Sequence, residues 1–255
     1  MHSQTTFLRR FGFASFSLVL LTVGLIHGPI HQPAHYHAFA DLYAYMGIPN
    51  TMDVLTNIGF LIAGLLGIYH YRQDSKNAGA WVICFYSLIG TAFGSAYYHL
   101  QPNDVRLVWD RLPITLTCIS VLIATSHSQK NNWLALFVGS MYALFSIAWW
   151  RHTGDLMFYL LVQIIALIWI PLNLYLHQRV VSCRWALLAS TCYLIAKICE
   201  WQDHLIFDHL LISGHSLKHV FAGLAAICLV RIYQTQSQHI ARANAYHDKQ
   251  QIHVS

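Results

Sequence analysis

The chain has 255 residues, of which 56% are hydrophobic and only 10% are charged. A soluble domain carries about 25% charged residues, so this composition excludes an ordinary water-soluble protein and predicts a membrane protein. The net charge of +5 does not indicate a nucleic-acid partner, because the basic residues are scattered between apolar runs rather than gathered on one face.

Eight apolar runs are long enough to cross a hydrocarbon core of about 30 Å, which takes about 17 to 25 helical residues. They lack the two-residue alternation of a membrane β-barrel, so the predicted fold is all-α, a polytopic transmembrane helical bundle. The runs, joined by short polar loops, cover about residues 11–28, 53–71, 79–99, 110–127, 133–150, 155–176, 183–201 and 213–233.

The first run has two possible interpretations, because Arg9 and Arg10 followed by apolar residues from Phe11 to Ile26 also resemble a secretory signal. The small-residue site at Ala38-Phe39-Ala40 lies about a dozen residues beyond the run, farther than cleavage normally occurs. We therefore predict an uncleaved membrane anchor.

Basic residues set the predicted orientation, because cytoplasmic loops of membrane proteins are enriched in lysine and arginine. With the N-terminus in the cytoplasm, only Arg106, Arg111 and Arg151 fall outside, so both termini are predicted to be cytoplasmic. The inner basic residues are then Arg9, Arg10, Arg72, Lys76, Lys130, Arg179, Arg184, Arg231, Arg242 and Lys249.

In this topology the end of the third run and the starts of the fourth and eighth lie at one non-cytoplasmic membrane level. That level holds Ser95 and His99, then Asp110, then His215 and His219. Residues four apart share a helix face, so two helices present three imidazoles there. Three imidazoles with an open fourth position are typical of a catalytic zinc site, whereas structural zinc sites usually contain cysteine.

The chemistry of such a site predicts the remaining roles. Zinc lowers the pKa of a bound water to about 7 and so supplies a nucleophile at ordinary pH. In HExxH metalloproteases a glutamate follows the first histidine as the base, but here Ser216 does. Asp110 is therefore the predicted base, carried back toward the last run by a loop over residues 100–109, and Ser95 is predicted to donate to the water or to the developing oxyanion.

This constellation resembles the alkaline ceramidase family, within the intramembrane hydrolases that include the adiponectin and progestin receptor relatives. The segments 47–57 (GIPNTMDVLTN) and 196–200 (AKICE) resemble the bacterial members in particular. The resemblance covers about residues 35–233 and implies a seven-helix hydrolase domain. Residues 1–34 add an extra N-terminal helix, and residues 234–255 form a polar cytoplasmic tail.

The resemblance also implies the activity. His99, His215 and His219 would bind Zn²⁺, Asp110 and Ser95 would handle the water and the oxyanion, and the amide bond of a ceramide would be hydrolysed. The expected partners are an amphiphilic, ceramide-like lipid substrate and membrane lipids, with the site open toward the non-cytoplasmic side. A bacterial source would place the protein in the inner membrane.

Eukaryotic members of the family also bind calcium through an acidic N-terminal segment. The corresponding residues here are Asp41, Asn50 and Asp53, and Ca²⁺ prefers six to eight oxygen ligands, so these side chains alone are insufficient. In the alternative interpretation, Asp41 and Asn50 cap helices and stabilise a turn around Pro49.

Two other polar groups stand out. The histidines at 27, 31, 35 and 37 would stack on a helix, but Gly28, Pro29 and Pro33 interrupt it, which favours a polar linker. Lys197 and Glu200 lie three apart and are predicted to form an ion pair on one helix face.

Two alternative functions stay open at this point. The first is a receptor-like or lipid-binding protein of the same group, in which zinc shapes a pocket and turnover is negligible. The second is a haem-binding membrane electron carrier, which also uses histidines on membrane helices but would need neither Asp110 nor Ser95.

Overall fold

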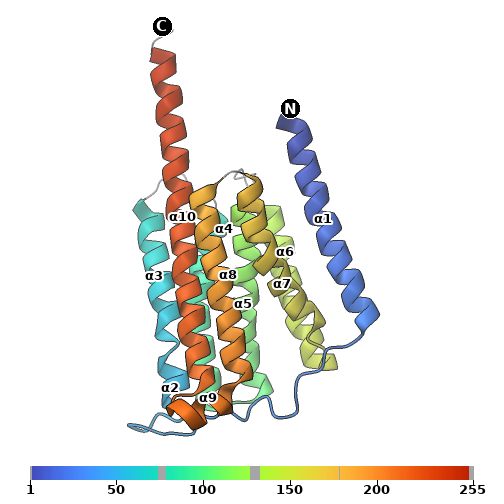
Figure 1. The fold of residues 1–255 in the computed structure, drawn as a ribbon, viewed down its shortest axis with the longest axis vertical. Coiled ribbons are helices and arrows are strands. Elements are labelled where there is room, and N and C mark those ends of the chain that lie inside the picture. Colours follow the sequence, from blue (N-terminus) through green and yellow to red (C-terminus); the bar gives the residue numbers. More distant parts are fainter. Residues whose placement is uncertain (1, 74–78, 127–132, 178, 253–255) are drawn as a thin grey trace.

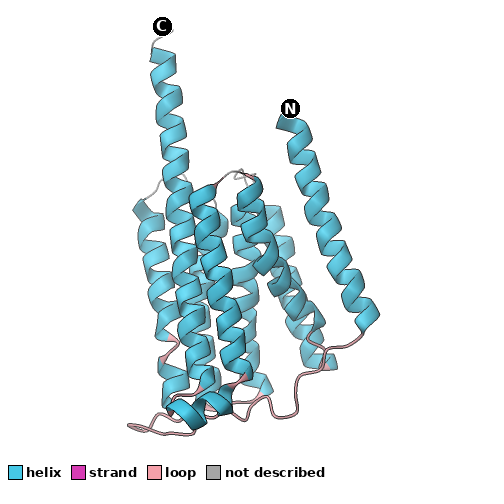
Figure 2. Ribbon diagram, viewed as in Figure 1, coloured by secondary structure: helices cyan, strands magenta, loops and turns pink. Residues whose placement is uncertain are grey.

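The structure is a computed structural model that describes residues 2–73, 79–126, 133–177 and 179–252, with side chains from residue 11 to residue 242. Over these residues the chain is an all-α helical bundle, as predicted (Figure 2). The helices are α1 (His2–His27), α2 (Thr51–Leu55), α3 (Ile58–Gln73), α4 (Gly79–Leu100), α5 (Asp104–Thr125), α6 (Trp133–Thr153), α7 (Met157–Leu176), α8 (Val180–Trp201), α9 (Asp203–Leu210) and α10 (Gly214–Ile252).

Seven helical segments among the described residues are long and apolar enough to cross a membrane, which makes this a multi-pass membrane protein by length and composition. They are α4 to α8, α2 with α3 as one segment, and α10 as far as Arg242. The extra N-terminal helix is α1, whose apolar part, Phe11–His27, is shorter than these seven. A membrane crossing by α1 therefore stays a prediction.

Helix α1 stands at the edge of the bundle (Figure 1). The rings of Phe13 and Phe16 pack against Trp169 of α7, with centroids 5.3 and 5.7 Å away. The N-terminal end of α1 and the C-terminal end of α10 point to the same end of the molecule, while α2 and α9 lie at the other (Figure 1). Which end faces the cytoplasm stays a prediction.

The predicted start of the fourth run is wrong by about a turn and a half, because α5 begins at Asp104 rather than near Asp110. The Asn103 side chain accepts a hydrogen bond from Arg106 N and caps the helix, so polar residues continue it beyond the apolar run. The expected loop over residues 100–109 is reduced to a short turn. Asp110 consequently lies within the helix, where it is 7% exposed.

The two ends of the bundle differ in their buried charged residues. Trp81, Phe85 and Tyr233 belong to the largest apolar cluster, which joins α3 to α8 and α10. Buried carboxylates and the three buried histidines gather instead at the end where α4 ends and α10 begins, and we call this the histidine end of the bundle. A buried polar group is costly unless it is hydrogen bonded or used, so this end is where function is expected.

Two close helix approaches shape the histidine end. A Cβ atom on Gly94 of α4 would lie 2.0 Å from the Trp109 carbonyl oxygen of α5, so only glycine fits there. On the other side of the bundle, Gly59 of α3 faces Gly223 of α10, and a Cβ atom on Gly59 would lie 3.2 Å from the Gly223 Cα atom. These glycines allow the backbones to approach closely.

The linker between α1 and α2 runs across the histidine end (Figure 1). Asp155, between α6 and α7, holds its first part. One carboxylate oxygen accepts hydrogen bonds of 2.9 Å from Ile30 N and Met157 N, and the other accepts one of 3.1 Å from Trp149 Nε1. Asp203 holds a later part by accepting from Ala40 N at 2.9 Å.

Candidate metal centre

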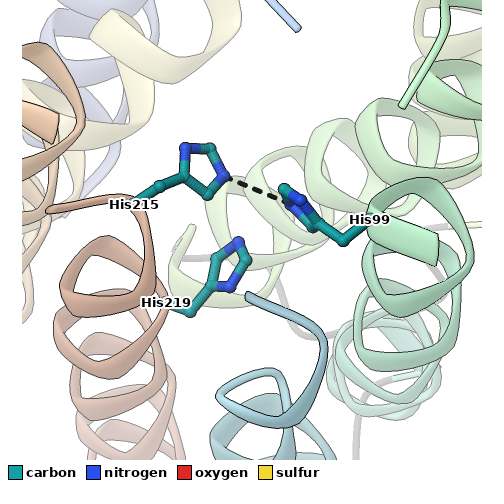
Figure 3. A group of neighbouring side chains, drawn as sticks. All are labelled: His99, His215 and His219. Carbon is teal, nitrogen blue, oxygen red and sulfur yellow. Dashed lines mark hydrogen bonds between the residues drawn. The ribbon is translucent and has the colours of Figure 1, made fainter. Parts of the chain in front are cut away.

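Three histidine side chains meet at the histidine end of the bundle, His99 from the last turn of α4 and His215 and His219 from the first two turns of α10 (Figure 3). One ligand nitrogen from each lies within 4.8 Å of the others, and the Nε2 atoms of His99 and His215 are 3.2 Å apart. The residues are only 1 to 2% exposed. This group can hold a metal ion.

The start of α10 is fixed by its own capping bonds. His215 N donates to Asp203 Oδ1 and Ser216 N donates to Ser213 Oγ, each over 2.9 Å, which satisfies two of the free N–H groups at the helix start. A Cβ atom on Gly214 would lie 2.3 Å from the Cys199 carbonyl oxygen, so α10 begins close against α8. His215 and His219 then follow one turn apart and face His99.

Asp53 is the fully buried carboxylate next to the histidines. Its Oδ2 atom lies 3.9 Å from His99 Nδ1, and neither atom has a hydrogen-bond partner. Its Oδ1 atom accepts hydrogen bonds from the hydroxyls of Ser213 and Ser216, at 3.0 and 2.6 Å. Thr56 Oγ1 lies 3.1 Å from His219 Nδ1.

The roles of the residues considered for calcium differ from the expected set. The Asp41 carboxylate accepts from Met52 N at 2.9 Å and from Asp53 N at 3.1 Å and so caps α2, as the alternative interpretation holds. Asn50 does not cap a helix through its side chain and instead donates to the His99 carbonyl oxygen at 2.7 Å. Asp53 belongs to the histidine group instead, through side-chain contacts with residues far along the chain that sequence reasoning missed.

Ser95 and Asp110 lie together beside the histidines. Both are buried, at 2% and 7% exposure, and the Ser95 hydroxyl lies close to the Asp110 carboxylate. Both line the same cavity as His219. The structure therefore brings all five residues singled out in the sequence to the same end of the bundle.

The cavity has a volume of about 180 Å³ and lies between α4, α5, α7, α8 and α10. Most of its wall is apolar, with side chains such as Leu88, Ile170 and Leu229 toward the end where the termini lie. The polar part of its wall lies at the histidine end and includes Ser95, Asp110, Lys197, Glu200, Lys218 and His219. An apolar chamber with a polar end suits an amphiphile.

The predicted ion pair between Lys197 and Glu200 is confirmed, with Nζ 2.6 Å from Oε2. The pair has a third member that sequence reasoning missed. Lys218 Nζ lies 2.6 Å from the other Glu200 oxygen, Oε1. The signal was available, since Lys218 immediately precedes His219 and is costly within an apolar helix.

Phe39 of the linker covers the histidine group. Its ring centroid lies 4.2 Å from that of His215 and 4.9 Å from that of His99. The earlier histidines of the linker form no stack, because α1 ends at His27 and Gly28 follows with a positive φ of 86°. His37 instead contacts the Tyr98 hydroxyl at 2.8 Å and Asp104 Oδ1 at 3.1 Å.

Comparison of the sequence with models of known protein families and with curated proteins found no match. Functional assignment therefore depends on the buried histidines, the two neighbouring carboxylates and the amphiphilic cavity.

Proposed function

We propose that the protein is a zinc-dependent intramembrane hydrolase that cleaves the amide bond of a ceramide-like lipid. The observation that carries the proposal is the group of three buried histidines at the polar end of an otherwise apolar cavity. Such a location favours a lipid whose chain occupies the apolar part while its polar group reaches the histidines.

The residues fit a zinc ion. Three imidazole nitrogens without a cysteine are the donor set of catalytic zinc sites, which keep one position open. His99 Nδ1 and Asp53 Oδ2 are buried, face each other and lack partners. With His99 bound to metal through Nε2, its Nδ1 would carry the proton and point it at the carboxylate, an arrangement common behind metal-binding histidines.

His215 and His219 fit the same scheme, since Nε2 of His215 lies 3.2 Å from Nε2 of His99. Thr56 lies next to Nδ1 of His219, which leaves Nε2 of that ring for a metal. The three ring centroids are 4.7 to 4.9 Å apart, so no porphyrin plane fits between them, and this spacing favours a single ion over haem. Bound there, zinc would supply an activated water and polarise the scissile carbonyl.

The two carboxylates take different roles. Asp110 lines the cavity, so it can accept a proton from the attacking water and return it to the departing amine nitrogen. The Ser95 hydroxyl lies beside the Asp110 carboxylate and can donate to it or to the developing oxyanion. Asp53 is fully buried and bonded to two serine hydroxyls, which makes it a positioning residue for His99 rather than the base.

Two substitutions test the proposal. His219→Ala removes one of three ligands, and we expect the purified protein to lose its zinc and its amide lipid turnover. Asp110→Asn leaves the histidines intact, so we expect normal zinc content with turnover lowered about 100-fold or more, the usual contribution of a general base. Metal analysis and mass spectrometry of released fatty acid measure the two properties.

Exposed residues of α9 provide matched controls, because His209 and Asp208 carry the same side chains away from the cavity. His209→Ala and Asp208→Asn should retain both zinc and turnover. Normal amide hydrolysis by the Asp110→Asn protein would refute the assigned role of this carboxylate. Zinc binding without turnover in the unaltered protein would favour the receptor-like alternative.

A further inference from the structure

A cluster of three charged side chains lies beside the histidines and has no part in the mechanism above. Glu200 bridges two ammonium groups, with Lys197 and Lys218 each 2.6 Å from one of its oxygens. The side chains of Glu200 and Lys218 are 18% and 17% exposed, that of Lys197 is 39% exposed, and all three residues line the cavity. A bridged triad that serves only packing would not need to face a cavity.

Lys218 is the member nearest to the metal centre. Its Nζ atom lies 3.3 Å from His215 Nε2, the atom that also faces His99. The Lys218 ammonium group can therefore donate a hydrogen bond to a ligand bound at the metal centre. Since the metal is itself a cation, the two positive charges repel unless an anion lies between them.

A bound metal would leave the charges at this end of the cavity unbalanced. Lys197 and Lys218 face Glu200 and Asp110 in the cavity wall, so the wall carries two cations and two carboxylates. The buried Arg111 and Asp53 add one charge of each sign, and a divalent metal at the histidines would add two further positive charges. Buried charge is costly without a partner, so the site is suited to a ligand that brings a negative charge.

We infer that the substrate is an amide lipid with a carboxylate on its amine side, as in an N-acyl amino acid. This inference rests on the proposed function and names the substrate class of that site. The apolar part of the cavity takes the acyl chain, so the charged group must belong to the amine. Because Lys218 lies next to the metal centre, its carboxylate partner must lie within a few bonds of the amide, as an α-carboxylate does.

The reaction is a hydrolysis. Water adds its oxygen to the acyl carbon, the carbon–nitrogen bond breaks, and the nitrogen takes up a proton. The products are a fatty acid and a free amino acid, and no oxidant or further reactant is needed.

The test uses two ligands that differ at one group, N-palmitoylglycine with a carboxylate and N-palmitoylethanolamine with a hydroxymethyl group. Calorimetric titration in detergent measures binding to the full-length protein with its metal chelated, so that no turnover interferes. Initial rates with the zinc-loaded protein follow. We expect the anionic ligand to bind, and to be cleaved, roughly 10- to 100-fold better, the usual contribution of a hydrogen bond between charged groups.

Substitutions of Lys218 then locate the preference. Lys218→Met should remove it, so that both ligands bind equally, whereas Lys218→Arg should retain most of it. Arg231→Met removes a cation from an exposed position on the same helix, where the guanidinium contacts Gln234, and should leave the preference unchanged. A merely structural role of Lys218 would weaken both ligands alike.

If the neutral ligand binds the unaltered protein as tightly as the anionic ligand does, the inference is overturned. This comparison needs no variant protein. Equal losses for both ligands in Lys218→Met would overturn it as well. Cleavage of the neutral amide alone refutes the inference and supports the proposed function. Tight binding of the anionic ligand without cleavage of either refutes the proposed function and supports the inference.

Discussion

Replacement of Asp53 with asparagine tests how His99 is held. The change removes the negative charge 3.9 Å from His99 Nδ1 but keeps an oxygen that can accept from Ser213 and Ser216. At an effective dielectric constant of about 20, a full charge pair at this distance interacts by about 4 kcal/mol. The metal-bound imidazole carries only part of a charge, so we expect a loss of about 1.4 to 2.8 kcal/mol of zinc binding free energy, or 10- to 100-fold.

Competition between the purified protein and a zinc chelator of known affinity measures this loss. Asp208→Asn, on the exposed side of α9, is the control and should bind zinc normally. Circular dichroism confirms that the helices persist in both variants. A zinc affinity of Asp53→Asn equal to that of the unaltered protein would show that His99 needs no carboxylate, and the assignment of Asp53 would be withdrawn.

Two further predictions concern stability. Gly94→Ala should lower the thermal unfolding midpoint, at a cost of about 1 to 3 kcal/mol of stability, because the new Cβ atom would overlap the Trp109 carbonyl oxygen. Gly90→Ala is the control and should cost less, since the nearest atom to its new Cβ atom is 3.3 Å away. Equal unfolding midpoints for the two variants would contradict the close approach at Gly94. Asp155→Asn should destabilise the fold because the carboxylate accepts three hydrogen bonds. Burial acts to raise the pKa of Asp155, but these bonds outweigh it and lower the pKa below the usual 3.8. The carboxylate therefore stabilises the fold above about pH 4, and its contribution is lost as the pH falls through the lowered pKa. Unfolding midpoints of the two proteins should converge in acid, and a gap that widens there would contradict the sign.

The sequence was sufficient for the long apolar helices but not for the short helix α9 or for all the helix ends. Apolar runs identify membrane helices because a helix needs about 20 apolar residues in succession to cross the bilayer. This criterion does not detect a polar first turn. It therefore missed that α5 begins at Asp104, before its apolar run. The Asn103 cap was the signal that could have corrected it.

The histidines and their shared depth could be inferred from spacing and charge, because both depend on local periodicity. A lysine at position 218 within an apolar helix was a signal for a buried partner, but its pairing with Glu200 could not be inferred, since the two residues belong to different helices. Asp53 was considered only as a possible calcium ligand for the same reason. Its neighbours Ser213 and Ser216 lie 160 and 163 residues farther along the chain, and only the packed bundle brings them together.

The contact between Gly59 and Gly223 bears on how much sequence change the metal centre tolerates. Gly223 lies one helical turn beyond His219, and Gly59 lies about one turn beyond Thr56, the residue next to His219 Nδ1. The backbone separation at these glycines therefore sets the separation between the histidine and its neighbours. Any side chain at either position would push α3 and α10 apart, so residues that never contact the metal limit how accurately its ligands are placed.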